Sequence, residues 1–357
     1  MRRVAIVGAG IGAQHAEGYA ALPDRFEVAA VCDLDAERAA AVAGPGGRVE
    51  TDMDAVLDDP TIDLIDICLP PHLHLSACQA ALRAGKAVVC EKPLVASLAE
   101  ADALREAAEE AGRPVFPVFQ YRFGVGTAQM RALMDAGLTG AAYVATLETH
   151  WNRPPDYYAV PWRGTWAGER GGALLGHAIH IHDLLPSILG PVASVHAETA
   201  TRVNDIEVED CAALAIRMAS GALVTSSVTL GAAEDSSRLR LVFEGLTAES
   251  DHAPYAPAAR PWSFKARSPR EQDEIDAVLA TVGDAPVGYV GLFAAIADAL
   301  DGDPGREVTL EDGIRSLEFV TACYASARGG EPVALPLEAD HPMRLGWLPS
   351  DTPHNTD

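Results

Sequence analysis

The first residues with a recognisable chemistry form a glycine-rich turn, GAGIGA at residues 8–13, which directly follows an apolar run. Gly8 would permit a tight turn, Gly10 would let the backbone approach a pyrophosphate, and Ala13 would let the next helix pack closely on the strand. The start of that helix presents unpaired N–H groups and a partial positive charge to an anion. The turn therefore predicts a dinucleotide site formed by Gly8, Gly10, Ile11 and Gly12.

Asp33 follows the second apolar run, where a carboxylate would meet the adenosine ribose. Its charge would accept hydrogen bonds from both ribose hydroxyls and repel a 2′-phosphate, which favours NAD over NADP as the cofactor. Arg38 could reach the same edge and would favour NADP. A purely structural glycine turn, with an acidic cap on the next helix, is the alternative that these residues leave open.

Two further polar segments follow apolar runs, LPPHLH at residues 69–74 and CEKP at residues 90–93. Ligands of open α/β sheets bind outside the carboxyl ends of the strands. We therefore expect five of these residues beside the cofactor, namely Leu69, Pro70, His74, Glu91 and Lys92. For His72 and His74 the alternative is that one of them caps the following helix.

Short apolar runs alternate with helical patterns through residue 121, which is typical of parallel βαβ units and a doubly wound sheet. The strands are expected at 3–7, 26–32, 64–69, 87–90 and 115–119, and the helices at 12–21, 36–42, 73–84 and 98–111. The fold class is thus α/β, with an N-terminal Rossmann domain at residues 1–121.

Longer alternating runs follow, at 142–151, 192–201, 211–218, 222–230 and 238–243, and predict a large, mostly antiparallel open sheet. Helical patterns lie at 127–136, 172–189, 272–282, 288–300 and 310–327, and a proline-rich loop is expected at 254–269. We expect one α+β domain at residues 122–357 that binds substrate and forms the oligomer.

Acidic residues outnumber basic residues by 51 to 27 in this chain of 357 residues, which leaves a formal charge of −24. Such a charge repels phosphate backbones and anionic lipids, so nucleic acid and membrane partners are not expected. No apolar run reaches the roughly 18 residues of a membrane span. The six cysteines are scattered, and Cys32, Cys68 and Cys90 lie inside apolar runs, as buried thiols do in a reducing compartment, so we expect a cytoplasmic protein.

Four motifs occur in this order along the chain: GAGIGAQH, EKP at 91–93, WRGTW at 162–166 and GGALLGHAIHIHDLL at 171–185. Together with the C-terminal run EDGIRSLEFVTACYASARGGEPVALPL they resemble the Gfo/Idh/MocA family over almost the whole chain. The resemblance implies a Rossmann domain, a second domain whose open sheet often forms a dimer interface, and hydride transfer between NAD(P) and a sugar, polyol or cyclic alcohol.

The resemblance also assigns roles to single residues. Lys92 matches the family's catalytic lysine, His180 the histidine of the GGALxDxGxHxxD motif, and Asp183 its final aspartate. A neutral histidine can take the hydroxyl proton, and a lysine ammonium stabilises the developing alkoxide. The motif's first aspartate is replaced by Gly176, which leaves a gap one turn before His180.

The histidine cluster can be sorted by regular helical geometry at 100° per residue. Residues 176, 180 and 183 then share a face, so that Asp183 would orient His180, whereas His182 points nearly opposite. His180 and His182 therefore cannot bind one ion together, and no metal is expected.

The remaining substrate-side candidates lie near the aromatic stretch at 151–166, whose rings suit the C–H faces of a sugar. Arg163, in the WR pair, is expected at the cofactor or substrate, with a salt bridge as the alternative. The residues expected to contact substrate are Arg122, His150, Asn152, Tyr158, Trp162, His177 and His180.

These expectations define a function. An NAD-dependent dehydrogenase would act on a secondary hydroxyl of a sugar, glycoside or cyclitol, as a homodimer or homotetramer. The alternative is a glycoside-cleaving enzyme that oxidises a ring carbon transiently and then eliminates, with no net NADH release.

Overall fold

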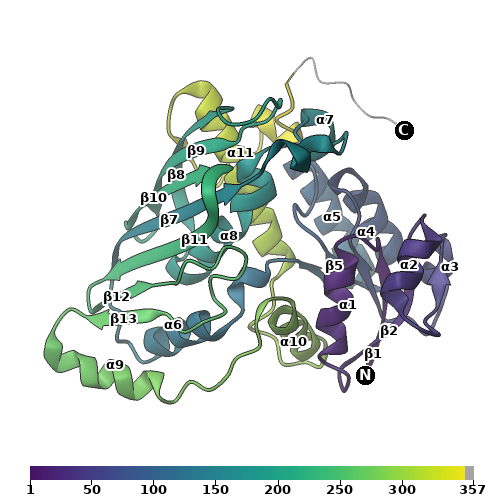
Figure 1. Ribbon diagram of the computed structural model, residues 1–357, viewed down its shortest axis with the longest axis horizontal. Helices are drawn as coiled ribbons and strands as arrows, with labels where there is room; N and C mark the ends of the chain where they lie inside the picture. The colour runs from purple at the N-terminus through teal and green to yellow at the C-terminus, as the bar shows by residue number, and fades with distance from the viewer. Residues whose placement is uncertain (350–357) are drawn as a thin grey trace. The chain divides into compact units, whose positions relative to one another are not determined.

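The structure is a computed structural model that describes residues 1–349, and its chain divides into two compact units (Figure 1). The N-terminal unit comprises residues 1–119 and 289–317, and the C-terminal unit comprises residues 120–288 and 318–349 of the described chain. The sequence predicts a single boundary after residue 121. The structure differs in that a late segment, 289–317, joins the N-terminal unit, and residues 350–357 of the predicted second domain lie outside the described residues.

The N-terminal unit is built on a six-stranded parallel sheet in the order β3-β2-β1-β4-β5-β6. Its strands are β1 (Arg2–Val7), β2 (Phe26–Cys32), β3 (Val49–Glu50), β4 (Leu64–Ile67), β5 (Ala87–Cys90) and β6 (Val115–Pro117). Strands β4 and β5 are buried along their whole length, as expected for a sheet covered on both faces. The strand order reverses between β1 and β4, and ligands of doubly wound sheets bind at such a point.

The helices of this unit are α1 (Gly12–Ala20), α2 (Ala36–Ala43), α3 (Asp54–Leu57), η1 (Pro71–Leu73), α4 (His74–Arg83), α5 (Leu98–Ala111) and α10 (Gly288–Leu300). Ser97 caps the start of α5, and Gly112 ends it in the left-handed region with φ of 59°.

Helix α10 packs on α1, and this contact explains why the late segment belongs to the N-terminal unit (Figure 1). The ring of Phe293 stacks on Tyr19 with centroids 3.9 Å apart. A Cβ at Gly18 would lie 2.8 Å from the Phe293 ring, so glycine is what allows the close approach.

The C-terminal unit is built on an eight-stranded sheet in the order β13-β12-β11-β7-β10-β9-β8-β14. The strands are β7 (Ala142–Asn152), β8 (Val192–Ala200), β9 (Cys211–Met218), β10 (Leu223–Thr229), β11 (Gly231–Phe243), β12 (Leu246–Glu249), β13 (Ser263–Ala266) and β14 (Val333–Ala334). All neighbours are antiparallel except β7 and β10. Burial alternates strictly along β9 and β10, so one face is covered and the other is open.

The helices of the C-terminal unit are η2 (Gln120–Arg122), α6 (Val125–Asp135), η3 (Pro155–Ala159), α7 (Trp166–Glu169), η4 (Leu174–Ala178), α8 (Ile179–Leu189), η5 (Pro269–Glu271), α9 (Gln272–Leu279) and η6 (Pro342–Leu345), and α11 (Leu310–Gly329) has residues in both units. Among residues 1–349, no helix combines the length and the apolar character needed to cross a bilayer.

Two sequence predictions are corrected by the structure. The helix predicted over 172–189 is not regular, because η4 is a π-helical turn that precedes α8. The segment predicted as a loop at 254–269 contains β13, which pairs with β12 and extends the sheet.

Candidate active-site residues

The glycine turn has the backbone geometry of a phosphate-binding loop. Gly8 has φ of 102°, and a Cβ there would lie 2.4 Å from the carbonyl oxygen of Cys68 at the end of β4. A Cβ at Gly10 would meet no atom within 4 Å, so space is open on that side of the turn. A Cβ at Gly12 would lie 2.7 Å from the Ile6 side chain, so α1 packs closely on β1 at this residue.

Asp33 is tied to this turn. One carboxylate oxygen accepts a hydrogen bond from the backbone N–H of Ala9 at 2.7 Å, and the other from the Arg38 guanidinium at 2.8 Å. Burial raises the pKa of Asp33, but the hydrogen bonds from Ala9, Asp35 and Arg38 outweigh burial and hold it below its usual value. Asp33 is therefore an anion at the edge of the turn, and it holds the Arg38 guanidinium in a hydrogen-bonded ion pair.

His74 braces two strand-end loops. Its ring nitrogens lie 2.8 Å from the carbonyl oxygens of Leu69 and Pro93, and its pKa is lowered by burial. Both nitrogens thus face backbone within the unit, and the EKP segment is connected to the loop after β4, which contains Leu69 and Pro70.

A buried charge network lies beneath Lys92. Nδ1 of His15 lies 2.8 Å from Asp66, and Nε2 lies 3.0 Å from Glu91. The second oxygen of Glu91 accepts the backbone N–H of Lys92 at 3.0 Å. Burial lowers the pKa of His15, but the Asp66 charge, helped by Cys68, raises the net value well above 6.5. A doubly protonated ring can donate to both carboxylates, so the network links α1, β4 and the strand end that carries Lys92.

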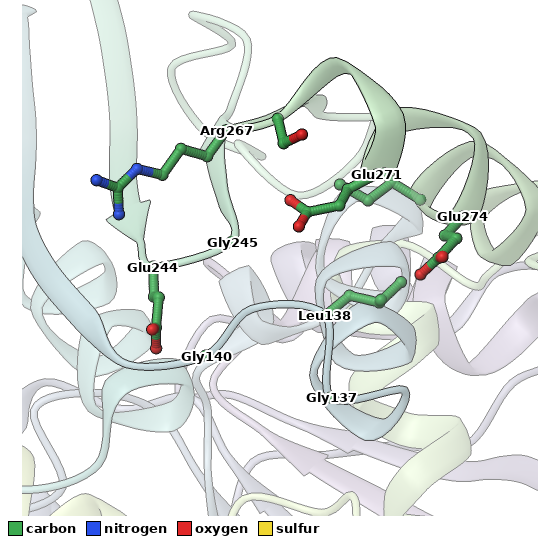
Figure 2. A pocket seen from close by; sticks show the side chains of 10 residues that line it. Gly137, Leu138, Gly140, Glu244, Gly245, Arg267, Glu271 and Glu274 are labelled. Atoms are coloured by element: carbon green, nitrogen blue, oxygen red, sulfur yellow. The ribbon is translucent and has the colours of Figure 1, made fainter.

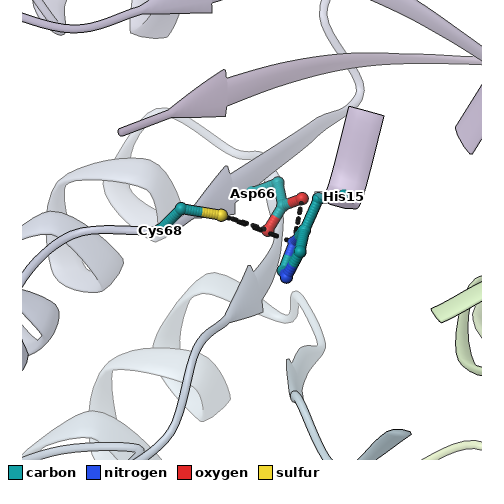
Figure 3. A group of neighbouring side chains, drawn as sticks. All are labelled: His15, Asp66 and Cys68. Carbon is teal, nitrogen blue, oxygen red and sulfur yellow. Dashed lines mark hydrogen bonds and ion pairs between the residues drawn. The ribbon is translucent and has the colours of Figure 1, made fainter. Parts of the chain in front are cut away.

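His15, Asp66 and Cys68 also offer three potential metal ligands within 4.8 Å of one another (Figure 3). Two ligands about 2.0–2.1 Å from a tetrahedral zinc ion lie about 3.3 Å apart. The 2.8 Å between His15 and Asp66 is a hydrogen-bond distance instead. The donor set therefore fits a proton-sharing network better than a metal centre.

In the C-terminal unit, Arg122 and Asp183 form a bidentate ion pair. The Arg122 Nε and Nη2 atoms donate to the two carboxylate oxygens at 2.7 and 2.6 Å, and both side chains are buried. The neighbouring Tyr121 ring stacks on His180 with centroids 4.7 Å apart. The segment η2 therefore supports two of the predicted residues of α8, and Arg122 is placed as a partner of Asp183, which sequence analysis did not predict.

His182 is separated from this pair. Its Nε2 lies 2.9 Å from the Ser226 hydroxyl on β10, and burial lowers its pKa to about 3. His182 is therefore a neutral residue that packs α8 on the sheet.

Glu209 holds the start of the π-helical turn. Its carboxylate accepts the backbone N–H groups of Gly172 and Leu174 at 3.0 to 3.1 Å and the Tyr324 hydroxyl at 3.0 Å. Burial raises the pKa of Glu209 to about 7, and the hydrogen bonds limit this rise. Glu209 was not predicted from the sequence, because its partners lie more than 30 residues away.

The π-helical turn changes the predicted arrangement around His180. Regular helical arithmetic does not apply between Gly176 and His180, because η4 is wider than an α-helix. A Cβ at Gly176 would meet no atom within 4 Å, which agrees with the gap expected there. π-helical turns occur frequently at functional sites.

His177 lies among aromatic residues. Its Nε2 is 3.5 Å from the Tyr157 hydroxyl, and its ring contacts Trp151 edge to face with centroids 5.3 Å apart. Tyr158 contacts Tyr157 edge to face at 5.1 Å, and the exposed ring of Trp162 lies under the Arg163 guanidinium at 4.8 Å. The structure thus gathers His177, Tyr158, Trp162 and Arg163 around Tyr157.

His150 and Asn152 are placed differently. His150 lies on the open face of the sheet, 2.9 Å from the Ser227 hydroxyl, whereas the adjacent Trp151 lies on the covered face. The Asn152 backbone binds Asp235, and its side chain is exposed. The structure does not bring His150 together with His177.

One pocket of the C-terminal unit contains none of the predicted residues (Figure 2). It has a volume of about 640 Å³ and lies between the loop after α6, the β11–β12 turn and α9. Glu244, Glu271, Glu274 and Arg267 line it.

The predicted site residues fall into two sets. The N-terminal unit holds the glycine turn, Asp33, Glu91 and Lys92, and the C-terminal unit holds Arg122, Arg163, His177, His180 and Asp183. The first set can bind a dinucleotide and present an ammonium group, and the second offers an imidazole with a buried ion pair.

Comparison with known proteins identifies matches to both parts of the chain. Residues 2–119 match the model described as an oxidoreductase family with an NAD-binding Rossmann fold, and residues 127–249 match the GFO/IDH/MocA C-terminal domain. The solved WlbA dehydrogenase of Bordetella pertussis, in complex with NADH and UDP-GlcNAcA, is 30% identical, with a TM-score of 0.81 over 94% of this chain and 99% of that one.

Two curated relatives are named for sugar substrates. The D-glucoside 3-dehydrogenase of Escherichia coli is 32% identical over 57% of this chain and 58% of its own length. The levoglucosan dehydrogenase of Pseudarthrobacter phenanthrenivorans is 28% identical over 57% of this chain and 55% of its own length. The chain thus matches little more than half the length of these relatives.

Proposed function

Because the chain belongs to the Gfo/Idh/MocA family of NAD-binding oxidoreductases, we propose that it transfers a hydride between the nicotinamide and a secondary hydroxyl of a sugar, glycoside or cyclitol. The observation that carries this proposal is the position of Lys92. It follows β5 on the rim of an NAD-binding sheet, and its backbone N–H is held by Glu91. Two relatives are named as dehydrogenases of a glucoside and of levoglucosan, which supports a sugar as substrate.

Bound NAD supplies the hydride acceptor. The hydroxyl proton of the substrate must also be removed, and two side chains of this protein have suitable chemistry. The Lys92 ammonium stabilises the developing alkoxide by its charge, and the His180 imidazole accepts the proton. The Arg122–Asp183 pair and the Tyr121 ring fix the end of the chain segment on which His180 lies.

The test is a panel of sugars, methyl glycosides and cyclitols with NAD and with NADP, followed at 340 nm. At least one compound should give NADH. Lys92→Met and His180→Ala should lower kcat by about 10²–10⁴ while NAD still binds. Lys265→Met, at an exposed lysine of β13, is the matched control and should behave as wild type. An enzyme that binds NAD but gives no NADH with the whole panel contradicts the proposal.

A second candidate is NAD-dependent glycoside cleavage without net NADH release. It is favoured by the space at Gly176, where a Cβ would meet no atom within 4 Å, since a missing carboxylate leaves room for a larger glycoside. Release of 4-nitrophenol from 4-nitrophenyl glycosides without NADH supports cleavage. Stoichiometric NADH supports the dehydrogenase.

We also propose a cytoplasmic homo-oligomer that pairs through the open sheet face. Leu223 and Val144 are neighbours in adjacent strands on this face, and they are 49% and 47% exposed. Adjacent exposed apolar side chains on an open sheet face support an interface there, because contiguous apolar surface marks interaction sites. The six cysteines are free thiols, as in a reducing compartment. Light scattering should give a dimer or tetramer, and Leu223→Glu should lower the mass.

A further inference from the structure

Two arginine side chains stack on the ring of Tyr157. The Cζ atom of Arg163 lies 4.0 Å from the Tyr157 centroid and 4.8 Å from that of Trp162. The Cζ atom of Arg153 lies 5.2 Å from the Tyr157 centroid and 4.9 Å from that of Trp151. The aromatic rings fix the planes of both guanidinium groups.

The charge of Arg153 is neutralised within the protein. Its Nη1 lies 3.2 Å from the Asp235 carboxylate, and its Nη2 donates to the Tyr255 hydroxyl at 3.3 Å. The Tyr255 hydroxyl in turn donates to Asp235. Arg153, Asp235 and Tyr255 therefore form a closed group that needs no external anion.

Arg163 is different. Among residues 1–349, no carboxylate lies within ion-pair distance of its guanidinium, and its side chain is half-buried. Its edge therefore retains donors suited to a carboxylate or a phosphate, because stacking occupies only the faces of the group. The Arg163 guanidinium is thus a positive charge with no carboxylate paired to it in the described part of a chain whose formal charge is −24.

This cation is connected to the predicted substrate residues. The Tyr157 ring that supports Arg163 also carries the hydroxyl that lies 3.5 Å from His177. His177 lies in the π-helical turn directly before α8, on which His180 lies. One aromatic ring thus joins the cation to the turn that shapes the proton-accepting segment.

We propose that Arg163 binds an anionic substituent of the substrate, so that the preferred substrates are acidic sugars that carry a carboxylate or a phosphate. This proposal rests on the proposed function, since it concerns the same substrate site. The Tyr157 and Trp162 rings hold the guanidinium plane, and its edge forms two parallel hydrogen bonds to the anion. Arg163 is then a residue that determines specificity.

The test uses matched pairs of acidic and neutral ligands. Methyl β-D-glucuronide is compared with methyl β-D-glucoside, and D-glucose 6-phosphate with D-glucose, so that the carboxylate and phosphate arms are separate. Binding is measured by calorimetry in the presence of NADH, and turnover at 340 nm. Wild type should prefer one acidic member about tenfold or more, and Arg163→Gln should remove this preference.

Two variants serve as controls. Arg163→Lys keeps the charge and should retain part of the preference, which separates charge recognition from a structural role. Arg83→Gln removes an exposed arginine at the end of α4 and should leave the preference unchanged.

The outcomes distinguish this inference from the proposed function. Acidic ligands that bind through Arg163 without any NADH formation support the inference and contradict the dehydrogenase. NADH formation with equal binding of acidic and neutral partners overturns the inference alone. The inference is also overturned if neither acidic probe binds. It is likewise overturned if Arg163→Gln weakens only the affinity for NAD.

Discussion

The Arg122 guanidinium and the Asp183 carboxylate meet through two parallel hydrogen bonds of 2.7 and 2.6 Å, and their side chains are only 10% and 1% exposed. A buried charge that loses its partner is far more costly than the pair itself contributes. The ion pair therefore fixes η2 to α8.

The first prediction concerns this ion pair. Asp183→Asn should lower the free energy of unfolding by about 3–5 kcal/mol, because it removes the carboxylate that pairs with the buried Arg122 guanidinium. The double variant Arg122→Met with Asp183→Leu should lose less than the single variant. Urea unfolding followed by circular dichroism measures both. A single variant as stable as wild type would show that the pair is dispensable.

The second prediction concerns cofactor preference. Asp33→Ser should shift the ratio of kcat/KM for NADP over NAD upward by about tenfold to a hundredfold, because it removes the repulsion and releases Arg38 toward a 2′-phosphate. Asp35→Ser is the control, since Asp35 caps α2 and should affect stability only. An unchanged ratio would disprove the role of Asp33.

The third prediction concerns His15. A histidine whose folded pKa is raised stabilises the fold fully below its unfolded value of about 6.5, and this stabilisation is lost as the pH rises through the folded value. Wild type should therefore lose stability above about pH 6.5, and His15→Asn should lack this loss. His74→Asn should keep it, because the pKa of His74 is shifted downward. Thermal melting across pH 6 to 9 measures the difference.

The same network predicts an effect on the reaction. If Glu91 positions Lys92 through its backbone, Glu91→Gln should lower kcat and leave the affinity for NAD within a few-fold of wild type. An equal loss of NAD affinity would indicate a general disturbance of the sheet edge.

The fifth prediction concerns Glu209. Burial raises its pKa to about 7, so the folded state holds this proton more tightly than the unfolded state does. Wild type should then lose stability as the pH rises from about 4.5 to about 7, and Glu209→Gln should flatten this dependence. Glu207→Gln, at an exposed neighbour, should not. Parallel pH profiles for wild type and Glu209→Gln would contradict the assignment.

The strands and most helices follow from local patterns. The strand predicted at residues 211–218 has the same bounds as β9, and burial alternates along it. Helix α5 was predicted from its apolar period and the final Gly112, and it spans the expected residues. In both segments the local preference and the tertiary burial agree, which makes the pattern reliable.

The π-helical turn and the buried networks do not follow from such patterns. Periodicity assumes 3.6 residues per turn, so it cannot reveal the wider turn at η4. The signal in the sequence for the His15 network is Asp66, a charged residue in an apolar strand. The network itself cannot be predicted from spacing, because Asp66 and Glu91 lie 51 and 76 residues from His15. The glycine turn can be predicted from the sequence because its residues are contiguous.

The return of α10 to the N-terminal unit has a consequence for biosynthesis. A ribosome releases residues 1–119 long before residues 289–317, so the patch around Gly18 and Tyr19 stays uncovered while strands β7 to β13 of the other unit are being made. The apolar surface of α1 at Tyr19 should therefore stay accessible on the nascent polypeptide until Phe293 has left the exit tunnel.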